Sequence, residues 1–323
     1  MKAVVCRVLE GPDALVIEDR PSPVPGPGQV LVRVRAASVN FPDYLMTKGL
    51  YQLKPDLPFT PGMEAAGDIL ALGPDVTGWA VGDRVVATMR FGAFAEEVLA
   101  SAEGLMAIPP GFDYATGCAF PAAYSTAWVA LRRRDYVKPG EILLVHGAAG
   151  GVGLAAVELG KLFGARVIAT IGDDAKADVV RRYGADEVIN YRNGFREAVL
   201  EATGGRGADV IYDPVGGDVF DESTRCIAWG GRILIIGFAG GRIADLKTNM
   251  ALIKGFSVVG VRAGEFARRD PPAGRENMEA LLRLCAEGRI NPHVSHRLPL
   301  DKAADAMKVL ATRQVIGKCV LEL

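Results

Sequence analysis

Residues 141–153, EILLVHGAAGGVG, decide the fold class of this chain. The apolar run between Glu141 and His146 predicts a buried β-strand. Four glycines follow within the same segment, and the stretch Gly151–Phe163 has the length and composition of a helix. A strand that passes through a glycine-rich turn into a helix is typical of the first unit of a doubly wound α/β sheet.

The chain after this point alternates short apolar runs with helix-length segments. Further strands are predicted at Arg166–Ile171, Glu187–Asn190, Asp209–Asp213, Arg232–Gly237 and Gly255–Val261. Such an alternation requires parallel strands joined by right-handed crossovers. We therefore predict a Rossmann doubly wound parallel sheet over residues 125–289.

Residues before about 120 have a different pattern. Short runs of β-forming residues, such as Gln29–Ala36, are separated by turns rich in Gly and Pro, such as PSPVPGPG at 21–28. This pattern predicts an antiparallel β domain, a partly opened barrel. The last thirty residues return to it and end in the strand-like segment Lys318–Leu323. We therefore expect a discontinuous β domain built from residues 1–124 and 290–323.

Composition excludes several classes of protein. The chain has 323 residues, half of them hydrophobic, and its 37 basic and 38 acidic residues give a net charge of −1. A balanced chain has no basic field to attract nucleic acid, so a nucleic-acid partner is not expected. Five scattered cysteines without a C-x-x-C pair favour reduced thiols. Because no apolar leader or membrane-length apolar run is present, we expect a cytoplasmic protein.

The glycine loop predicts a dinucleotide site. Gly150 and Gly153 are three residues apart, as at the end of the G-x-G-x-x-G fingerprint, although alanine stands at its first glycine. Glycine lets the backbone approach a pyrophosphate, and the helix N-terminus offers free N–H groups and a positive dipole end. A tight packing turn is the alternative explanation, but the strand before and the helix after favour the dinucleotide.

The end of the second predicted strand bears on the choice between NAD and NADP. An NAD enzyme needs an acidic residue there to bind the ribose hydroxyls, and this chain has Ile171 and Gly172 instead. Asp173 and Asp174 come after the glycine, where an aspartate is typical of a helix N-cap. The missing ribose acid therefore favours NADP.

Donors to a 2′-phosphate follow further along the chain. Lys176, Tyr191 and Arg192 have the right chemistry to bind a phosphate by charge-assisted hydrogen bonds. The alternative is that Lys176 and Arg192 are solvated surface charges. We predict NADPH as the cofactor.

Longer segments extend these patterns along nearly the whole chain. They are SVNFPD (38–43), PGMEAAG (61–67), VGDRV (81–85), VHGAAGGVGLAAVELGKLFGARVIAT (145–170), GADEVINYR (184–192) and GGRILIIG (230–237). These segments resemble the quinone oxidoreductase (zeta-crystallin-like) branch of the medium-chain dehydrogenase/reductase superfamily. One departure is Glu158, where the branch usually carries Gln. The resemblance implies a GroES-like (chaperonin-10-like) β domain together with a Rossmann domain.

The resemblance also leads us to expect no metal. Alcohol dehydrogenases of this superfamily hold a catalytic zinc through Cys, His and Cys or Glu, and the matching positions here are Asn40, Met63 and Ala122. Zinc needs three protein ligands, and none of these three is suitable. His293 and His296 stand three residues apart but lie in a predicted turn.

Without zinc, hydrogen-bond donors must polarise a substrate carbonyl. The family pattern places Asn40, Asp43 and Tyr51 beside the nicotinamide, as the expected catalytic residues. The alternatives are that Asp43 only holds the loop and that Tyr51 is only an aromatic lid. The cofactor contacts that the resemblance implies are Asn40, Thr126, Ala149, Gly150, Gly151, Val152, Gly172, Lys176, Tyr191, Phe238, Ala239 and Arg313.

The function implied by the resemblance is NADPH-dependent transfer of hydride to a small molecule, either a quinone or an α,β-unsaturated carbonyl compound. An enoyl thioester reductase of the same fold and a non-catalytic NADPH-binding protein are the alternatives. The apolar segment Gly255–Val261, at the end of the predicted sheet, invites pairing with a second copy. We therefore expect a homodimer through this edge; the alternative is a monomer whose edge is covered.

Overall fold

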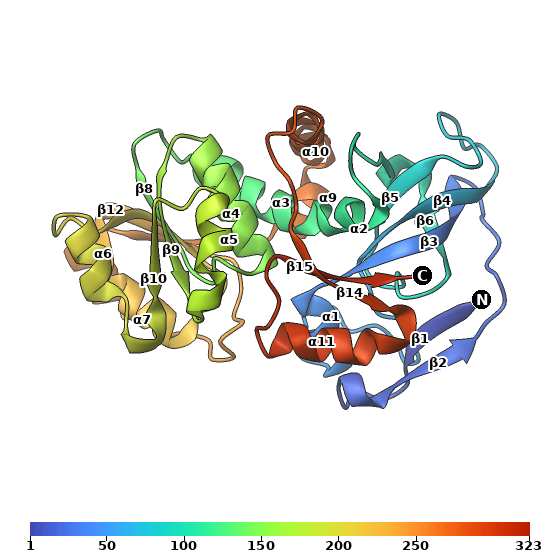
Figure 1. Ribbon diagram of the computed structural model, residues 1–323, viewed down its shortest axis with the longest axis horizontal. Helices are drawn as coiled ribbons and strands as arrows, with labels where there is room; N and C mark the ends of the chain where they lie inside the picture. Colours follow the sequence, from blue (N-terminus) through green and yellow to red (C-terminus); the bar gives the residue numbers. More distant parts are fainter. The chain divides into compact units, whose positions relative to one another are not determined.

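The computed structural model describes all residues from 1 to 323. They form two compact units, which Figure 1 labels by element. The β unit comprises Met1–Pro121 and Cys285–Leu323, and the Rossmann unit comprises Ala122–Leu284. The predicted division into domains, 1–124 with 290–323 and 125–289, stays a prediction.

The Rossmann unit contains a six-stranded parallel sheet in the order β10-β9-β8-β11-β12-β13. Its strands are β8 (Ile142–Val145), β9 (Arg166–Ile171), β10 (Glu187–Asn190), β11 (Ala208–Asp213), β12 (Ile227–Ile235) and β13 (Ser257–Gly260). The order reverses direction between β8 and β11, which is the topological switch point of a doubly wound sheet. The predicted Rossmann fold is confirmed.

Helices lie before, between and after these strands in the chain. They are α3 (Pro121–Trp128), α4 (Gly151–Leu162), α5 (Ala177–Arg182), α6 (Arg196–Ala202), α7 (Gly217–Cys226), α8 (Thr248–Lys254), α9 (Ala263–Arg269) and α10 (Pro271–Ala286). β8 is buried at every position, as its uninterrupted apolar run predicts. The carboxyl ends of β8, β9 and β11 therefore lie at one edge of the sheet, next to its buried central strand β8.

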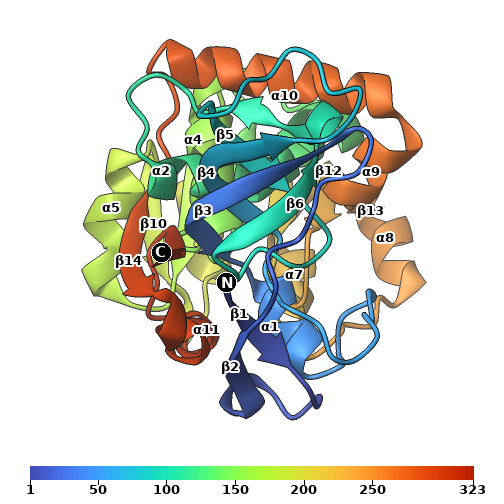
Figure 2. The ribbon, with the colours of Figure 1, turned by 90° about the vertical axis from the view of Figure 1, so that its right-hand side faces the viewer.

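The β unit contains a seven-stranded sheet and a two-stranded hairpin of β1 (Lys2–Cys6) and β2 (Leu15–Asp19). Figure 2 shows β3, β4, β5 and β6 in front of the viewer. The sheet consists of β14 (Val294–Pro299), β15 (Lys318–Glu322), β3 (Gln29–Val39), β4 (Glu64–Leu72), β5 (Arg84–Thr88) and β7 (Met106–Ala107) in that order, with β6 (Glu97–Ser101) paired to β3. Its helices are α1 (Phe41–Thr47), α2 (Tyr114–Ala119) and α11 (Ala303–Ala311).

The carboxy-terminal strand completes this sheet. β15 pairs antiparallel with β3, with Cys319 opposite Val39 and Leu321 opposite Ala37. The side chains of these four residues are buried. The tail therefore belongs to the core of the β unit, and the predicted discontinuous GroES-like domain is confirmed.

The edge strand of the Rossmann sheet is shorter than the predicted segment Gly255–Val261. Gly255 ends α8 in the left-handed conformation, with φ 64°, and so belongs to a helix terminus. Phe256 is buried, and the strand itself covers only Ser257–Gly260. Period and composition did not reveal the helix end because a glycine fits both a helix terminus and a strand interior.

Candidate functional site

The glycine loop joins β8 to the N-terminus of α4. A Cβ on Gly153 would lie 2.3 Å from the carbonyl oxygen of Gly147, so only glycine permits this contact between helix and loop. The Leu154 N–H, bonded to the Gly150 carbonyl at 2.8 Å, closes the first turn of the helix. The N-cap is Gly150, and the first turn holds neither a capping side chain nor an acidic residue. The N–H groups of residues 151–153 therefore fit an anion such as a pyrophosphate.

His146 holds the base of this loop, a role that the sequence did not reveal. It is fully buried, with Nδ1 2.9 Å from Thr170 Oγ1 and Nε2 2.8 Å from Ser223 Oγ. The Ser223 hydroxyl donates its proton to the Val219 carbonyl, so Nε2 must donate to Ser223 and Nδ1 must accept from Thr170. Burial lowers the pKa of His146 to about 3. A neutral imidazole therefore ties β8, β9 and α7 together beneath the loop.

The two aspartates after β9 are engaged locally. The Asp173 carboxylate accepts the N–H of Ala175 at 3.1 Å, as the N-cap of the 3-10 helix Asp174–Lys176. The predicted cap is confirmed. The Asp174 carboxylate accepts the side-chain N–H of Asn190 at 2.9 Å. Both carboxylates thus have partners within the turns after β9 and β10.

The structure brings Gly172 and Tyr191 together at the ends of these adjacent strands. A Cβ on Gly172 would lie 2.7 Å from the Tyr191 hydroxyl oxygen. Burial lowers the pKa of Lys176, on the neighbouring 3-10 helix, and the Asp173 charge opposes this shift. Arg192 lies beside Tyr191 in a second 3-10 helix, where its backbone N–H binds the Asn190 side chain at 3.1 Å. The four predicted contacts therefore lie on two neighbouring turns.

Two more loops lie at the carboxyl edge of the sheet. After β11, the Asp213 carboxylate accepts the N–H groups of Val215 and Gly216 at 2.8 and 2.9 Å. After β12, the Ala239 N–H binds the Pro214 carbonyl at 3.0 Å, and Phe238 is 39% exposed. The predicted contacts Phe238 and Ala239 thus lie on a loop anchored to its neighbour.

Thr126 is engaged within its own helix. Its hydroxyl donates to the Ala122 carbonyl at 2.7 Å within α3. Its predicted cofactor contact stays a prediction, as do those of the residues above.

Asp43 holds the turn between β3 and α1. Its side chain is fully buried and accepts the N–H of Asn40 at 2.8 Å and of Gly62 at 3.2 Å. Burial raises the pKa of Asp43 to about 7, although these N–H groups and the Lys318 charge oppose the rise. This geometry fits the alternative in which Asp43 supports the loop, because its carboxyl faces backbone amides.

The Asn40 side chain has two charged partners that the sequence did not reveal. Lys318 Nζ donates to Asn40 Oδ1 at 2.6 Å, and Asn40 Nδ2 donates to Glu64 Oε2 at 2.7 Å. Lys318 and Glu64 also form an ion pair at 3.3 Å. The only sequence signal for Lys318 and Glu64 is that each is a charged residue at the start of a strand.

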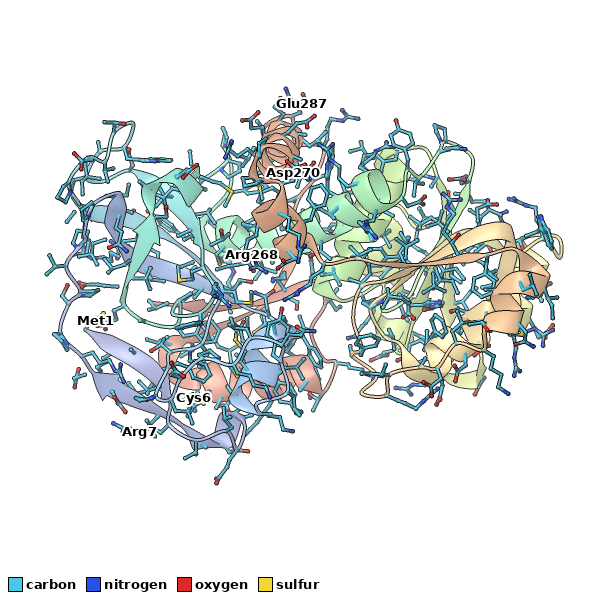
Figure 3. The ribbon with its side chains drawn as sticks, turned by 180° about the vertical axis from the view of Figure 1, so that it is seen from behind. Met1, Cys6, Arg7, Arg268, Asp270 and Glu287 are labelled. Carbon is cyan, nitrogen blue, oxygen red and sulfur yellow. The ribbon has the colours of Figure 1, made fainter.

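Tyr51 lies beside a small apolar cluster. The cluster consists of Cys6, Met46 and Phe59, and both Tyr51 and Met63 pack against it. Cys6 is labelled in Figure 3. The Tyr51 ring is thus half-buried, and its catalytic role stays a prediction.

Arg313 ends α11 in a conformation that favours glycine. Its φ is 59°, its N–H binds the Leu310 carbonyl at 3.0 Å, and the Gln314 N–H binds the Val309 carbonyl at 3.0 Å. These two bonds form a Schellman motif with Arg313 at the left-handed position. A long cationic side chain at a position usually held by glycine agrees with a functional reason for keeping it.

The residues of the chain do not gather into a metal site. No group of three or more His, Cys, Asp or Glu side chains is placed to hold a metal ion. All five cysteines are free and buried. In addition, none of the helices has both the length and the apolar character needed to cross a bilayer.

Comparison with known families assigns both parts of the chain. Residues 26–110 match the alcohol dehydrogenase GroES-like domain, and residues 151–287 match the family described as zinc-binding dehydrogenase. Quinone oxidoreductase-like protein 2 from Rattus norvegicus is 38% identical over 324 residues, which cover 100% of this chain and 92% of the relative. Quinone oxidoreductase from Pseudomonas aeruginosa is 36% identical over 315 residues, which cover 96% of each chain.

A solved structure gives the same result. Escherichia coli quinone oxidoreductase, complexed with NADPH, superposes with a TM-score of 0.93 at 29% identity, with 100% of both chains covered. Both domain families and full-length relatives thus agree with the glycine loop, the parallel sheet and the discontinuous β unit. The chain belongs to the quinone oxidoreductase branch of the medium-chain dehydrogenase/reductase superfamily.

Proposed function

We propose that this protein is an NADPH-dependent reductase that transfers hydride to a quinone or to the β-carbon of an α,β-unsaturated carbonyl compound, without zinc. One observation carries the choice of cofactor. Gly172 and Tyr191 are in contact where an NAD enzyme would carry an acid, Lys176 lies on the 3-10 helix that follows, and Asp173 is used as a helix cap. Escherichia coli quinone oxidoreductase, which is complexed with NADPH, supports the same choice.

The residues present fit this cofactor. The open N–H groups at the start of α4 suit a pyrophosphate, since the loop from Ala149 to Val152 carries no competing carboxylate. Lys176, Tyr191 and Arg192 supply donors for a 2′-phosphate. Thr126, Phe238, Ala239 and Arg313 are proposed as further contacts on the strength of the resemblance.

NADPH supplies the hydride when bound, and the protein supplies positioning and electrostatics. As the β-carbon of the substrate gains the hydride, negative charge develops on the carbonyl oxygen. The Asn40 amide and the Tyr51 hydroxyl are the donors that we assign to stabilise this charge. Asp43 supports Asn40, because its carboxyl accepts the Asn40 backbone N–H at 2.8 Å. A proton from a donor or from solvent then completes the reduction.

Residue chemistry supports the proposed independence from zinc. Asn40 and Met63 stand at two positions where zinc enzymes of the superfamily carry ligands, and the Asn40 amide already binds two charged groups. A thioether, an amide and the methyl group of Ala122 make a poor zinc site. We also propose a homodimer through β13, whose outer edge has no partner strand in the chain.

The direct test is NADPH consumption with a panel of acceptors. Absorbance at the NADPH band would be followed with a quinone, an enone and an enoyl thioester, before and after prolonged chelation. We expect turnover with the quinone or the enone, unaffected by the chelator. Turnover with the thioester alone, no turnover with any acceptor, or one tightly bound zinc per chain would each contradict the proposal.

A further inference from the structure

Three adjacent strands of the β unit meet beside Asn40. β3 lies between β15 and β4, with Val39 opposite Cys319 and Ser38 opposite Glu64. Asn40 follows β3 directly, while Lys318 and Glu64 are the first residues of β15 and β4. The sheet therefore brings an amide, an ammonium and a carboxylate together from distant parts of the sequence.

Hydrogen bonds join these three groups to one another, and the Asn40 amide also donates to the Ser38 carbonyl at 3.4 Å. Lys318 Nζ donates to Asn40 Oδ1 at 2.6 Å and to Glu64 Oε2 at 3.3 Å, and Asn40 Nδ2 donates to the same carboxylate oxygen at 2.7 Å. Reversing the amide would place its NH2 group against the ammonium and its oxygen against the carboxylate. The two charges therefore hold the amide in one orientation.

Because both charges are buried, this arrangement is an unfavourable way to stabilise the fold alone. The side chains of Glu64 and Lys318 are only 1% and 7% exposed. A buried ion pair loses the hydration of both charges and is weak evidence of stabilisation. Asn40, the partner that both charges share, is partly exposed. The two buried charges thus share one partner, the side-chain amide of Asn40, which is the partly exposed member of the cluster.

We infer that Lys318 and Glu64 are positioning residues that clamp the Asn40 amide for catalysis. The inference rests on the proposed function, in which Asn40 donates to the developing oxyanion. A donor contributes to catalysis when its direction is fixed before charge develops, because no reorganisation is then needed. Asp43 fixes the Asn40 backbone, and the Lys318–Glu64 clamp fixes its side chain.

The test removes both charges at once. The double variant Lys318→Met/Glu64→Gln removes both charges of the buried pair together, so neither is left without the other, which is the main cause of unfolding when one partner of a buried pair is lost. The matched control is Lys302→Met/Asp305→Asn, which removes an exposed ion pair of the same unit, 3.5 Å long. Three properties would be measured: the Asn40 side-chain amide resonances in ¹⁵N-labelled protein, assigned with Asn40→Asp, the steady-state kinetics, and the Kd for NADPH.

We expect the Asn40 amide protons of the double variant to shift and to exchange faster with water. The kcat should fall about 10-fold or more, as for a weakened oxyanion donor. The Kd for NADPH should change less than about 2-fold, since the clamp orients a donor to the substrate. The single variant Lys318→Arg keeps the positive charge and Glu64, so its kcat should lie between those of the double variant and the wild type. The control should match the wild type in every property.

Unchanged resonances, or an unchanged kcat despite altered resonances, would overturn the clamp. A raised Kd with an unchanged kcat would do the same, because it would make these residues a part of cofactor binding. The wild-type protein gives a test that needs no variant of the clamp to fold: the Asn40 amide protons must exchange more slowly than those of exposed Asn193. If the wild type oxidises no NADPH, the proposed function fails, while these resonances still decide whether the clamp exists.

Discussion

The hydroxyl oxygen of Tyr191 lies so close to Gly172 that a Cβ at position 172 would be 2.7 Å from it. The glycine therefore lets the hydroxyl reach the end of β9, although Tyr191 itself follows β10. In the proposed function this is where the 2′-phosphate of NADPH binds. At this contact, glycine stands where an NAD enzyme carries an acidic residue, and the Tyr191 hydroxyl beside it is the proposed donor to the phosphate.

Replacing the phosphate donors should change cofactor preference. A charge-assisted hydrogen bond contributes about 1.5–3 kcal/mol, so Lys176→Ala should raise the KM for NADPH about 10-fold or more and leave that for NADH nearly unchanged. Tyr191→Phe should act in the same direction. The control is Lys161→Ala, whose ammonium pairs with Asp186. Steady-state kinetics with both cofactors would decide, and equal effects on the two would place the phosphate elsewhere.

Replacing Arg313 by glycine should stabilise the fold and weaken cofactor binding. Because a non-glycine residue in the left-handed region costs about 1–2 kcal/mol, Arg313→Gly should raise the free energy of unfolding by roughly 1 kcal/mol. It should also weaken NADPH binding. Arg313→Ala is the matched control, since it removes the guanidinium but keeps the strained backbone. Denaturant unfolding and fluorescence titration would measure the two effects; unaltered affinity in both variants would remove Arg313 from the cofactor site.

The buried His146 should destabilise the protein in acid. Burial lowers its pKa to about 3 from an ordinary value of 6.5, so below pH 6.5 the unfolded chain binds a proton that the folded chain does not. Its contribution to stability is therefore lost as the pH falls from about 6.5 towards about 3. Asp43 has the opposite sign, since its pKa is raised from 3.8 to about 7 and its contribution is lost as the pH rises between those values.

His146→Gln separates the two groups, because the Asp43 contribution cancels when the variant is compared with the wild type. The stability advantage of the wild type should shrink by about 1.4 kcal/mol for each pH unit below about 6. Urea unfolding at several pH values measures this difference. A difference that stays constant down to pH 4 would mean that the folded protein takes up the proton.

Local patterns in the sequence were sufficient to predict the fold of the Rossmann unit. The run 141–153 predicted β8, the glycine loop and the start of α4, because burial and close packing act on neighbouring residues there. The N-cap role of Asp173 was also predicted, since a cap binds amides within two residues of itself. The predicted preference for NADP rests on residues close to Asp173, since Ile171 and Gly172 stand where an NAD enzyme carries an acidic residue.

Local patterns could not predict contacts between residues that are far apart in the sequence. Lys318 and Glu64 are separated by 254 positions, and only the pairing of β15 and β4 with β3 brings them to Asn40. The structural role of His146 had no local signal, because its partners Thr170 and Ser223 come from another strand and a helix. The left-handed φ of Arg313 had no signal, since glycine is the residue expected there.

The dimer can be tested at one amide of the edge strand. The Val261 N–H binds the Ile235 carbonyl at 2.9 Å, and alternation along β13 turns the Val258 N–H outwards. Val258→Pro removes this outward donor and leaves the bonds to β12 in place. Light scattering at micromolar concentration should show the mass falling from two chains to one, while Val258→Ala stays dimeric. A wild type of 34.2 kDa would contradict the proposed dimer without the variant.

The central claim, hydride transfer from NADPH to a conjugated acceptor, can be tested by following the hydride itself. The protein would be incubated with an enone and NADPH that carries deuterium at the transferable position of C4, and the product analysed by NMR. The account predicts one deuterium at the β-carbon of the reduced product, none at the α-carbon, and a much slower reaction with NADH. Deuterium only at the carbonyl carbon, or no reduced product from enones and quinones alike, would contradict it.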